Sequence, residues 1–238
     1  MNAPRRVLIV VTRRIGDVLL ATPLIRSLKL AWPQAQIDAL VFAGTEGIIA
    51  ANSDLHRVIT IGERPDFITH FRLVASLLRR YDLAVSCLPG DRPTLYAWLA
   101  GKKRVGLLLD EPAQRWKTKL LSQWAAFDNL NTHTVLMNLK LADLLNISKH
   151  YEVGTSWGKA AAARVDALLP QSATNPRFAV LHLYPKFNYK MWHARGWGEL
   201  AHWLAAQGLR VVLTGSSATE ELNYIAKILP SLPNDTVN

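Results

Sequence analysis

The chain has 238 residues, of which 50% are hydrophobic, and a formal net charge of +10. A chain of this length and composition can bury a full core, so we exclude a disordered or fibrous protein and expect one large domain or two small ones. No apolar run reaches the roughly 18 residues that a membrane span requires, and residues 1–6 lead directly into a strand-like segment. The single cysteine, Cys87, permits no internal disulfide. We therefore expect a soluble, cytoplasmic protein without a secretory signal.

The positive charge is unevenly distributed along the chain. Residues 1–150 carry 20 Lys and Arg against 12 Asp and Glu, whereas residues 151–238 carry 8 against 6. This excess predicts that the first part meets an anion, and nucleic acid, an anionic membrane surface and a phosphorylated acceptor all qualify. The basic residues form small separate groups rather than one recognition helix or an RNA-binding motif, which makes nucleic acid the least favoured partner.

Strand and helix patterns alternate through the first part of the chain. Val7–Val11 is a continuous apolar run typical of a buried parallel strand, and a segment of helical period follows at Val18–Leu30. The next expected elements are strands at Ile37–Phe42 and Arg57–Ile61, a helix at Phe67–Arg80, a strand at Leu83–Cys87, a helix at Pro93–Ala100 and a strand at Arg104–Leu109. Two helices without strands, Ala113–Ala126 and Thr132–Leu145, should close a domain over residues 1–152. The alternation predicts an α/β fold with helices on both faces of a parallel sheet.

A second α/β unit is expected over residues 153–238. An alanine-rich helix near Trp157–Leu169 and a polar link at residues 171–176 precede strands at Phe178–Leu183 and Arg210–Thr214 and helices at Trp197–Gln207 and Thr219–Leu229. Two strands leave open sheet edges and a small core, so we expect this unit to be the first part of a larger domain. Its next strand should begin near residues 236–238, and its helices should expose unusual amounts of apolar surface.

The loop Thr12–Asp17 after the first strand is the best candidate site, because ligands of open α/β sheets bind at the carboxyl ends of strands. It has one glycine and lacks the Gly-x-Gly-x-x-Gly spacing, and no Walker A pattern occurs in the chain, which weakens dehydrogenase and NTPase interpretations. Asp17 suits either a general base or a cap of the following helix. Arg13 and Arg14 suit an anion, because a guanidinium can grip a phosphate or carboxylate with two hydrogen bonds.

The segment Arg14-Ile15-Gly16-Asp17 and its continuation to Leu28 resembles the opening motif of glycosyltransferase family 9. The similarity continues through Arg104–Gly106, His133–Leu139, Lys190–Trp192 and residues 197–215. It implies an ADP-heptose:lipopolysaccharide heptosyltransferase, most similar to the heptosyltransferase III branch, that inverts the anomeric carbon without a metal or cofactor. The implied fold is GT-B, with two Rossmann-like doubly wound domains, the second incomplete in this chain and the chain by itself inactive.

The same resemblance implies roles for individual residues. Asp17 would be the general base, and a single carboxylate suffices because inversion needs one direct attack. The acceptor side would be bound by Arg13, Arg14, Arg104 and His133, and the donor side by Lys190, Thr214, Gly215 and either Glu220 or Glu221. Aromatic residues around Lys190, where relatives carry small residues, are a departure from the family pattern, and Lys186 could take its place.

The expected partners are an ADP-heptose donor and the lipopolysaccharide inner core, with peripheral contact at the inner face of the cytoplasmic membrane and no nucleic acid. Two alternatives stay open. One is a glycosyltransferase of the same fold with another nucleotide-sugar donor, and the other is a non-catalytic module that binds anionic glycolipid or nucleic acid. Metal binding finds no support, because the histidines show no paired spacing with Cys or acidic residues.

Overall fold

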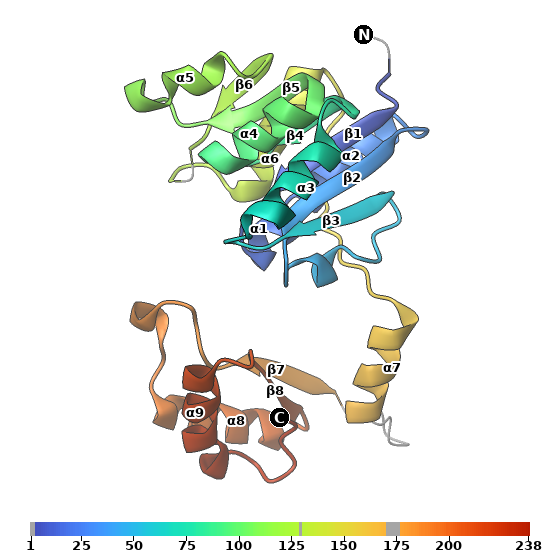
Figure 1. Ribbon diagram of the computed structural model, residues 1–238. Helices are drawn as coiled ribbons and strands as arrows, with labels where there is room; N and C mark the ends of the chain where they lie inside the picture. Colours follow the sequence, from blue (N-terminus) through green and yellow to red (C-terminus); the bar gives the residue numbers. More distant parts are fainter. Residues whose placement is uncertain (1–2, 129, 170–176) are drawn as a thin grey trace. The chain divides into compact units, whose positions relative to one another are not determined.

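A computed structural model describes residues 3–128, 130–169 and 177–238, and the chain divides into two compact units after Gly158 (Figure 1). This division lies six residues beyond the expected boundary at residue 152. Two backbone donors hold the connecting segment on the first unit: the N–H of His150 donates to Ser27 Oγ at 2.8 Å and that of Gly154 to Thr22 Oγ1 at 3.2 Å. The polar link predicted at residues 171–176 lies outside the described residues.

The first unit contains a six-stranded, entirely parallel sheet in the order β3-β2-β1-β4-β5-β6. Its strands are β1 Arg6–Val11, β2 Gln36–Phe42, β3 Arg57–Ile61, β4 Tyr81–Ser86, β5 Gly101–Leu108 and β6 Gln123–Ala126. Its α-helices are α1 Ile15–Leu19, α2 Thr22–Ala31, α3 Phe67–Leu77, α4 Asp91–Ala100, α5 Arg115–Thr118 and α6 Thr134–Leu145. The strand order is that of a doubly wound sheet, which confirms the predicted fold class.

Both faces of the sheet are buried, as continuous apolar strands require. Val7 and Ile9 belong to a core shared with α2 and α6, whereas Leu8 and Val10 belong to a second core shared with α3 and α4. Successive residues of β1 therefore serve opposite helix layers, and Figure 1 shows the helices of this unit around the sheet.

The continuous helix predicted at Val18–Leu30 is wrong, because the structure has two helices, α1 and α2, that meet at Leu20 and Ala21. Pro23 explains the break: within one continuous helix its ring would clash with the carbonyl of Leu19. That carbonyl accepts a hydrogen bond from Thr22 Oγ1 at 2.7 Å. The sequence thus contained the signal, and the helical periodicity on either side of Pro23 obscured it.

The strandless end predicted for the first unit is also wrong. Gln123–Ala126, expected within a helix, forms β6 and pairs in parallel with β5. The segment Gln-Trp-Ala-Ala has no β-branched residue and only one strand-favouring side chain, Trp124, so its local propensity for a strand is weak. Pairing with β5 overrides that propensity, and only α5 and the 3₁₀ turn Pro112–Gln114 occupy the start of the predicted helix.

The second unit is a smaller α/β layer. After α7, Lys159–Leu168, its strands β7 Phe178–His182 and β8 Arg210–Thr214 pair in parallel, and α8 Ala194–Ala206 and α9 Thr219–Ile228 follow them in turn. Val237 forms a parallel bridge with Val212 and exchanges hydrogen bonds with Val211 and Leu213, 2.9 and 2.7 Å long. A third parallel segment therefore begins where the sequence predicted the next strand.

Large apolar side chains of the second unit are exposed on both helices and on β7. Trp203 of α8 is 59% exposed, Leu222 of α9 is 52% exposed, and Val180 of β7 is 54% exposed. Among the described residues of this unit the buried core is correspondingly small, with eight members: Leu181, Leu183, Ala201, Val211, Leu213, Ile225, Ile228 and Leu232. Over the described ranges, no helix is both long and apolar enough to cross a bilayer.

Candidate active site

The chain continues from β1 to β2 on one side of the sheet and from β4 to β5 on the other, and β1 and β4 are neighbours although β2, β3 and their helices separate them in sequence. At such a switch point the loops that follow the two strands open a crevice at their carboxyl ends. Here these are the loop Thr12–Arg14 after β1 and the loop Cys87–Gly90 after β4, joined at their base by the hydrogen bond from Cys87 N to Val10 O, 3.1 Å. The fold thus brings Asp17 and the β4–α4 loop to the same edge.

Asp17 lies in the first turn of α1 and does not cap it. The N-cap is Arg14, with extended backbone angles, so the alternative of Asp17 as the cap of a helix starting at Val18 is wrong. Its carboxylate is 22% exposed, and Oδ2 lies 3.5 Å from Nε of Arg13, which is 45% exposed. A carboxylate in the first helical turn is stabilised by the partial positive charge of that end. Asp17 is therefore an accessible carboxylate beside one guanidinium, in a position to accept a proton.

The β4–α4 loop is held by a buried lysine that the sequence did not identify as a site residue. Lys117 of α5 has a side chain that is 1% exposed, and its Nζ donates to the carbonyl of Pro89 at 2.8 Å. The same ammonium forms an ion pair of 2.5 Å with Asp91, whose side chain is 68% exposed. A charge buried this deeply needs such partners. Lys117, which lies between β5 and β6 in sequence, therefore fixes the β4–α4 loop in place.

A Leu-Pro-Gly-Asp sequence directly after an apolar strand could have drawn attention to this loop, since turn residues at a strand's carboxyl end often build sites. Nothing in the sequence pairs it with Lys117, because the partner lies 28 positions away from Pro89. Cys87, at the start of the loop, is fully buried, and burial raises the pKa of its thiol to about 12. That thiol is no nucleophile at neutral pH.

His133 is the N-cap of α6, where its Nδ1 accepts a hydrogen bond of 3.3 Å from the N–H of Val135. Because α6 follows β6, this end of the helix lies at the carboxyl edge of the sheet. One turn further along, Asn138 Nδ2 donates to the carbonyl of Leu20 at 3.0 Å, at the junction between α1 and α2. This buried amide, which the sequence did not single out, ties the His133 helix to the Asp17 helix.

Arg104 lies elsewhere in the sheet. Through the registers of β4 and β5 it is level with Leu8 of β1, three residues before the strand's end at Val11. At about 3.3 Å per residue its backbone is roughly 10 Å from the carboxyl edge. The side chain is partly buried, and its Nε has no hydrogen-bond partner within the described ranges. The structure does not bring Arg104 together with Asp17.

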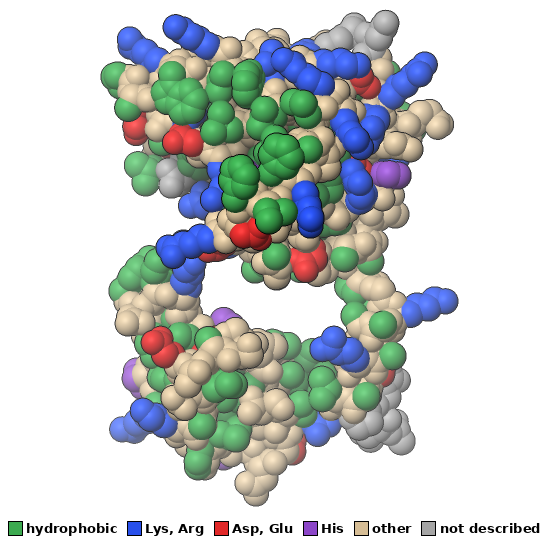
Figure 2. Space-filling view, viewed as in Figure 1, with side chains coloured by type: hydrophobic (Ala, Val, Ile, Leu, Met, Phe, Trp, Pro, Cys, Tyr) green, Lys and Arg blue, Asp and Glu red, His purple; other side chains and the backbone are tan. Residues whose placement is uncertain are grey.

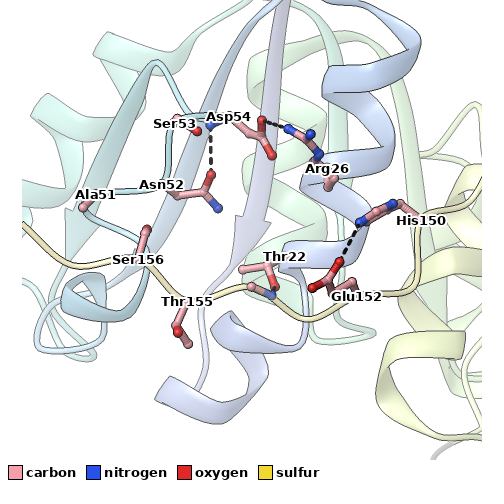
Figure 3. A pocket seen from close by; sticks show the side chains of 11 residues that line it. Thr22, Arg26, Ala51, Asn52, Ser53, Asp54, His150, Glu152, Thr155 and Ser156 are labelled. Carbon is pink, nitrogen blue, oxygen red and sulfur yellow. Dashed lines mark hydrogen bonds and ion pairs between the residues drawn. The ribbon is translucent and has the colours of Figure 1, made fainter.

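A pocket of about 250 Å³ lies beside the segment that connects the two units (Figure 3). Its walls come from α2, from the loop before β3 and from residues 150–156. Figure 3 shows that its charged groups face each other: Arg26 Nη1 pairs with Asp54 at 2.8 Å, and His150 Nε2 lies 3.9 Å from Glu152. None of the predicted site residues lines this pocket, so it is distinct from the predicted acceptor and donor sites.

The predicted donor residues of the second unit lie in the β7–α8 loop, at the carboxyl end of β8 and in the first turn of α9. At Gly215 an added Cβ would lie 2.7 Å from Glu221 Oε1 and 3.0 Å from Ile225 Cδ1, so a larger residue requires the Glu221 side chain to move. Glu221 is 6% exposed and accepts a hydrogen bond of 2.5 Å from Ser216 Oγ. Glu221 therefore stabilises the turn Thr214–Ser216 through this hydrogen bond, and Glu220 is the exposed acid of the pair.

Glu220 faces the β7 loop. Its Oε2 accepts a hydrogen bond of 3.4 Å from the hydroxyl of Tyr184, and desolvation together with this neighbouring carboxylate raises the pKa of Tyr184. At the base of the same edge, His182 Nδ1 lies 2.9 Å from the carbonyl oxygen of Thr214. These contacts place Thr214, Gly215, Glu220 and Glu221 in one cluster.

Lys190 closes the 3₁₀ turn Asn188–Lys190 in the β7–α8 loop and is exposed. Its Nζ lies 5.8 Å from the ring centre of Phe187 and 5.6 Å from that of Tyr189, distances typical of cation–π contact. The loop is attached to α9 through Tyr224, whose hydroxyl donates to Trp192 O at 2.8 Å. The aromatic residues that depart from the family pattern thus position the lysine side chain.

The sequence profile of glycosyltransferase family 9 (heptosyltransferase) matches residues 71–238, well over half of the chain. The chain belongs to this family. Among curated proteins it is similar to lipopolysaccharide heptosyltransferase 3 of Escherichia coli K12, with 25% identity over 232 residues. That alignment covers 90% of this chain and 64% of the relative, so the chain spans less than two thirds of the relative's length.

Two solved structures show the same fold at low sequence identity. The family 9 glycosyltransferase of Veillonella parvula superposes with a TM-score of 0.81 at 14% identity, covering 98% of this chain and 68% of that one. E. coli heptosyltransferase WaaC, solved with ADP-2-deoxy-2-fluoro heptose, gives a TM-score of 0.71 at 22% identity, covering 98% and 76%. The fold is that of the GT-B heptosyltransferases. Across the described residues, no group of three His, Cys, Asp or Glu side chains is arranged to hold a metal ion.

Proposed function

We propose that the gene product carrying this chain transfers heptose from ADP-heptose to the lipopolysaccharide inner core, with inversion and with Asp17 as the general base. The observation that carries the proposal is an accessible carboxylate at the switch point of a family 9 sheet, 3.5 Å from the guanidinium of Arg13. The relatives named above support the donor and the acceptor, because one is a lipopolysaccharide heptosyltransferase and another was solved with an ADP-heptose analogue.

In the proposed reaction Asp17 takes the proton of an acceptor hydroxyl as its oxygen attacks the anomeric carbon of the donor. The bond between that carbon and the diphosphate oxygen breaks on the opposite side, and ADP leaves with the electron pair. Inversion follows from this single displacement. Arg13 keeps an anionic acceptor group beside Asp17, and Arg14, at the N-cap of the same helix, extends the basic surface.

The departing diphosphate carries negative charge that protein groups must meet when no metal takes part. In this proposal Lys190 supplies the cation, while the turn Thr214–Gly215 and the exposed carboxylate of Glu220 face the nucleotide. Glu221 positions that turn through Ser216. Because the acceptor is anchored in a membrane, the protein works at the inner face of the cytoplasmic membrane through peripheral contact.

The test is Asp17→Asn in the full gene product, with transfer from ADP-heptose measured on isolated inner-core acceptor. The amide cannot take the proton, so we expect kcat to fall by roughly 10²–10⁴-fold while ADP affinity stays unchanged. Asp143→Asn, at the far end of α6 where the carboxylate pairs with Lys149, is the matched control and should keep full activity. Normal turnover of the Asp17 variant would remove this residue from the mechanism.

The same assay separates the remaining alternatives. Transfer from another nucleotide sugar, but not from ADP-heptose, would retain the glycosyltransferase and replace its donor. Binding of the acceptor or of oligonucleotide without transfer from any donor would support a non-catalytic binding module.

A further inference from the structure

Helix α3 presents an apolar face to solvent. Phe67, Ile68, Phe71 and Leu78 are 83%, 60%, 63% and 53% exposed, and we call these four residues the α3 face. The rings of Phe67 and Phe71 stack with their centroids 6.4 Å apart and an angle of 21° between their planes. The aromatic pair therefore forms one continuous apolar surface and not two isolated side chains.

Burial in the core does not account for these residues. The core side of α3 is supplied by Leu73 and Leu77, which are 8% and 1% exposed and pack in the cluster with α4. A surface helix normally turns polar residues outward once its inner stripe is filled. Here the outer stripe is apolar as well, and contiguous exposed apolar surface of this kind marks an interaction site.

The α3 face has a basic rim. Arg64, Arg72 and Arg80 are exposed and form no ion pair with any of the described residues. Of the two acids nearby, Asp66 is engaged as the cap of α3, accepting hydrogen bonds from the N–H and hydroxyl of Thr69, while Glu63 is exposed. Figure 2 shows hydrophobic side chains gathered on this side of the first unit with Lys and Arg side chains around them.

The position of α3 relates this face to the acceptor edge. The helix follows β3, so its first turn, with Phe67 and Ile68, begins beyond the carboxyl end of that strand. Asp17 follows the carboxyl end of β1 in the same parallel sheet. Arg92, in the first turn of α4, joins α4 to the loop before α3 by donating to the carbonyl of Glu63 at 2.6 Å. The aromatic end of the α3 face thus lies at the edge that holds the proposed base.

We propose that the α3 face docks this protein on an anionic lipid bilayer, with Phe67 and Phe71 entering the headgroup region and the arginines of the rim meeting lipid phosphates. Aromatic rings on a helix lying in the interface, with cations beside them, are the features that such binding uses. This proposal rests on the proposed function, because an enzyme whose acceptor is held in a membrane must reach that acceptor from the bilayer surface. Charge decides between occupants, because a second copy of this chain would bring its own basic rim against this one.

Vesicle flotation tests the proposal with the intact protein. The protein should float with vesicles of phosphatidylethanolamine and phosphatidylglycerol and not with vesicles of phosphatidylcholine alone. Phe67→Ser combined with Phe71→Ser should weaken this binding roughly tenfold or more, because two exposed rings no longer enter the interface. Leu30→Ser, which changes a side chain that is 55% exposed on α2, is the matched control and should bind as the parent does.

A second variant, Arg72→Gln with Arg80→Gln, probes the rim. It should weaken binding to phosphatidylglycerol vesicles severalfold at low salt and much less at high salt. Unchanged vesicle binding in both variants, or no binding by the parent protein, would overturn the proposal. Conversion of a dimer to a monomer by the phenylalanine variant would also overturn it, because the face would then join two copies.

Transfer to a deacylated, water-soluble acceptor distinguishes this proposal from the proposed function. The phenylalanine variant should retain that transfer in full while losing transfer to acceptor embedded in vesicles. If the parent protein binds vesicles through the α3 face but transfers no heptose, the proposed function fails and the docking surface stands.

Discussion

The two units hold their candidate site residues in different ways. In the first unit, contacts between segments far apart in sequence fix the loops: Lys117 reaches Pro89 across 28 positions, and Asn138 reaches Leu20 across 118. In the second unit the turn after β8 is braced by Glu221, five positions from Ser216. The contacts at the first site therefore cross the whole sheet, whereas those of the second unit are of shorter range: they join β7 and the loop after it to β8 and α9 over 32 to 36 positions, as between Tyr184 and Glu220.

The hydrophobic cores of the two units differ as well. The first unit has two clusters, one on each face of its sheet, while the described part of the second has a single cluster of eight residues. Loss of the contacts that fix the β4–α4 loop should therefore appear as a loss of stability of the first unit, and loss of the Glu221 contact as a loss of both stability and donor binding in the second.

The largest expected effect is at the buried lysine. Asp91→Ala removes the carboxylate and leaves the ammonium of Lys117 buried, which should lower the free energy of unfolding of the first unit by about 2–3 kcal/mol. Lys117→Met removes the buried charge itself and leaves Asp91 in solvent, so it should cost only about 1–2 kcal/mol. Urea unfolding measures both. A Lys117→Met variant less stable than Asp91→Ala would show that the lysine acts mainly through packing and Pro89.

An intermediate effect is expected at Gly215. The new Cβ of Gly215→Ala would lie 2.7 Å from Glu221 Oε1, so the carboxylate must move and its hydrogen bond to Ser216 must break. We expect a loss of about 1–3 kcal/mol in the second unit and weaker ADP binding in the full gene product, measured by calorimetry. Gly158→Ala, with no atom within 4 Å of the added Cβ, is the control. Normal ADP affinity of the Gly215 variant would place the nucleotide elsewhere.

The smallest expected effect is a loss of stability of the first unit at alkaline pH. Burial and the hydrogen bond to Asp38, 2.7 Å long, raise the pKa of Tyr81 from 10.0 to about 12. The unfolded chain loses this proton first, so the stabilisation is complete below pH 10 and is lost as pH rises towards 12. Tyr81→Phe should cost about 1 kcal/mol at neutral pH and flatten the decline above pH 10. Unfolding followed by circular dichroism against pH measures this, and an equally steep decline in the variant would assign it to another group.

Periodicity and turn residues predicted most of the fold. Apolar runs such as Val7–Val11 and Ile37–Phe42 become the central strands β1 and β2, because a strand buried on both faces has to be apolar throughout. The alternation of strands with helices predicted the parallel doubly wound sheet. The motif from Arg14 to Leu28 predicted the family, and the loop that contains Asp17 lies at the switch point where the fold rule puts it.

Other features required the three-dimensional arrangement. The break between α1 and α2 depends on a steric conflict at Pro23 that helical periodicity hides, and β6 exists because β5 offers it a partner. Arg104 shares a motif with Gly106, yet the sheet register keeps it away from the carboxyl edge. The proposal that Glu220 and not Glu221 faces the nucleotide rests on the burial of Glu221, which the sequence does not give.

By itself the sequence determined the fold class, the family and the loop that carries Asp17, because each of these depends on local patterns of side chains along the chain. Only the tertiary structure decided that Lys117 clamps the β4–α4 loop, that Glu221 supports the turn at Gly215 and that the outer side of α3 is apolar. The physical reason is the same in all three. Burial and charge pairing are properties of the surroundings of a side chain, and the packing of helices, strands and loops creates those surroundings.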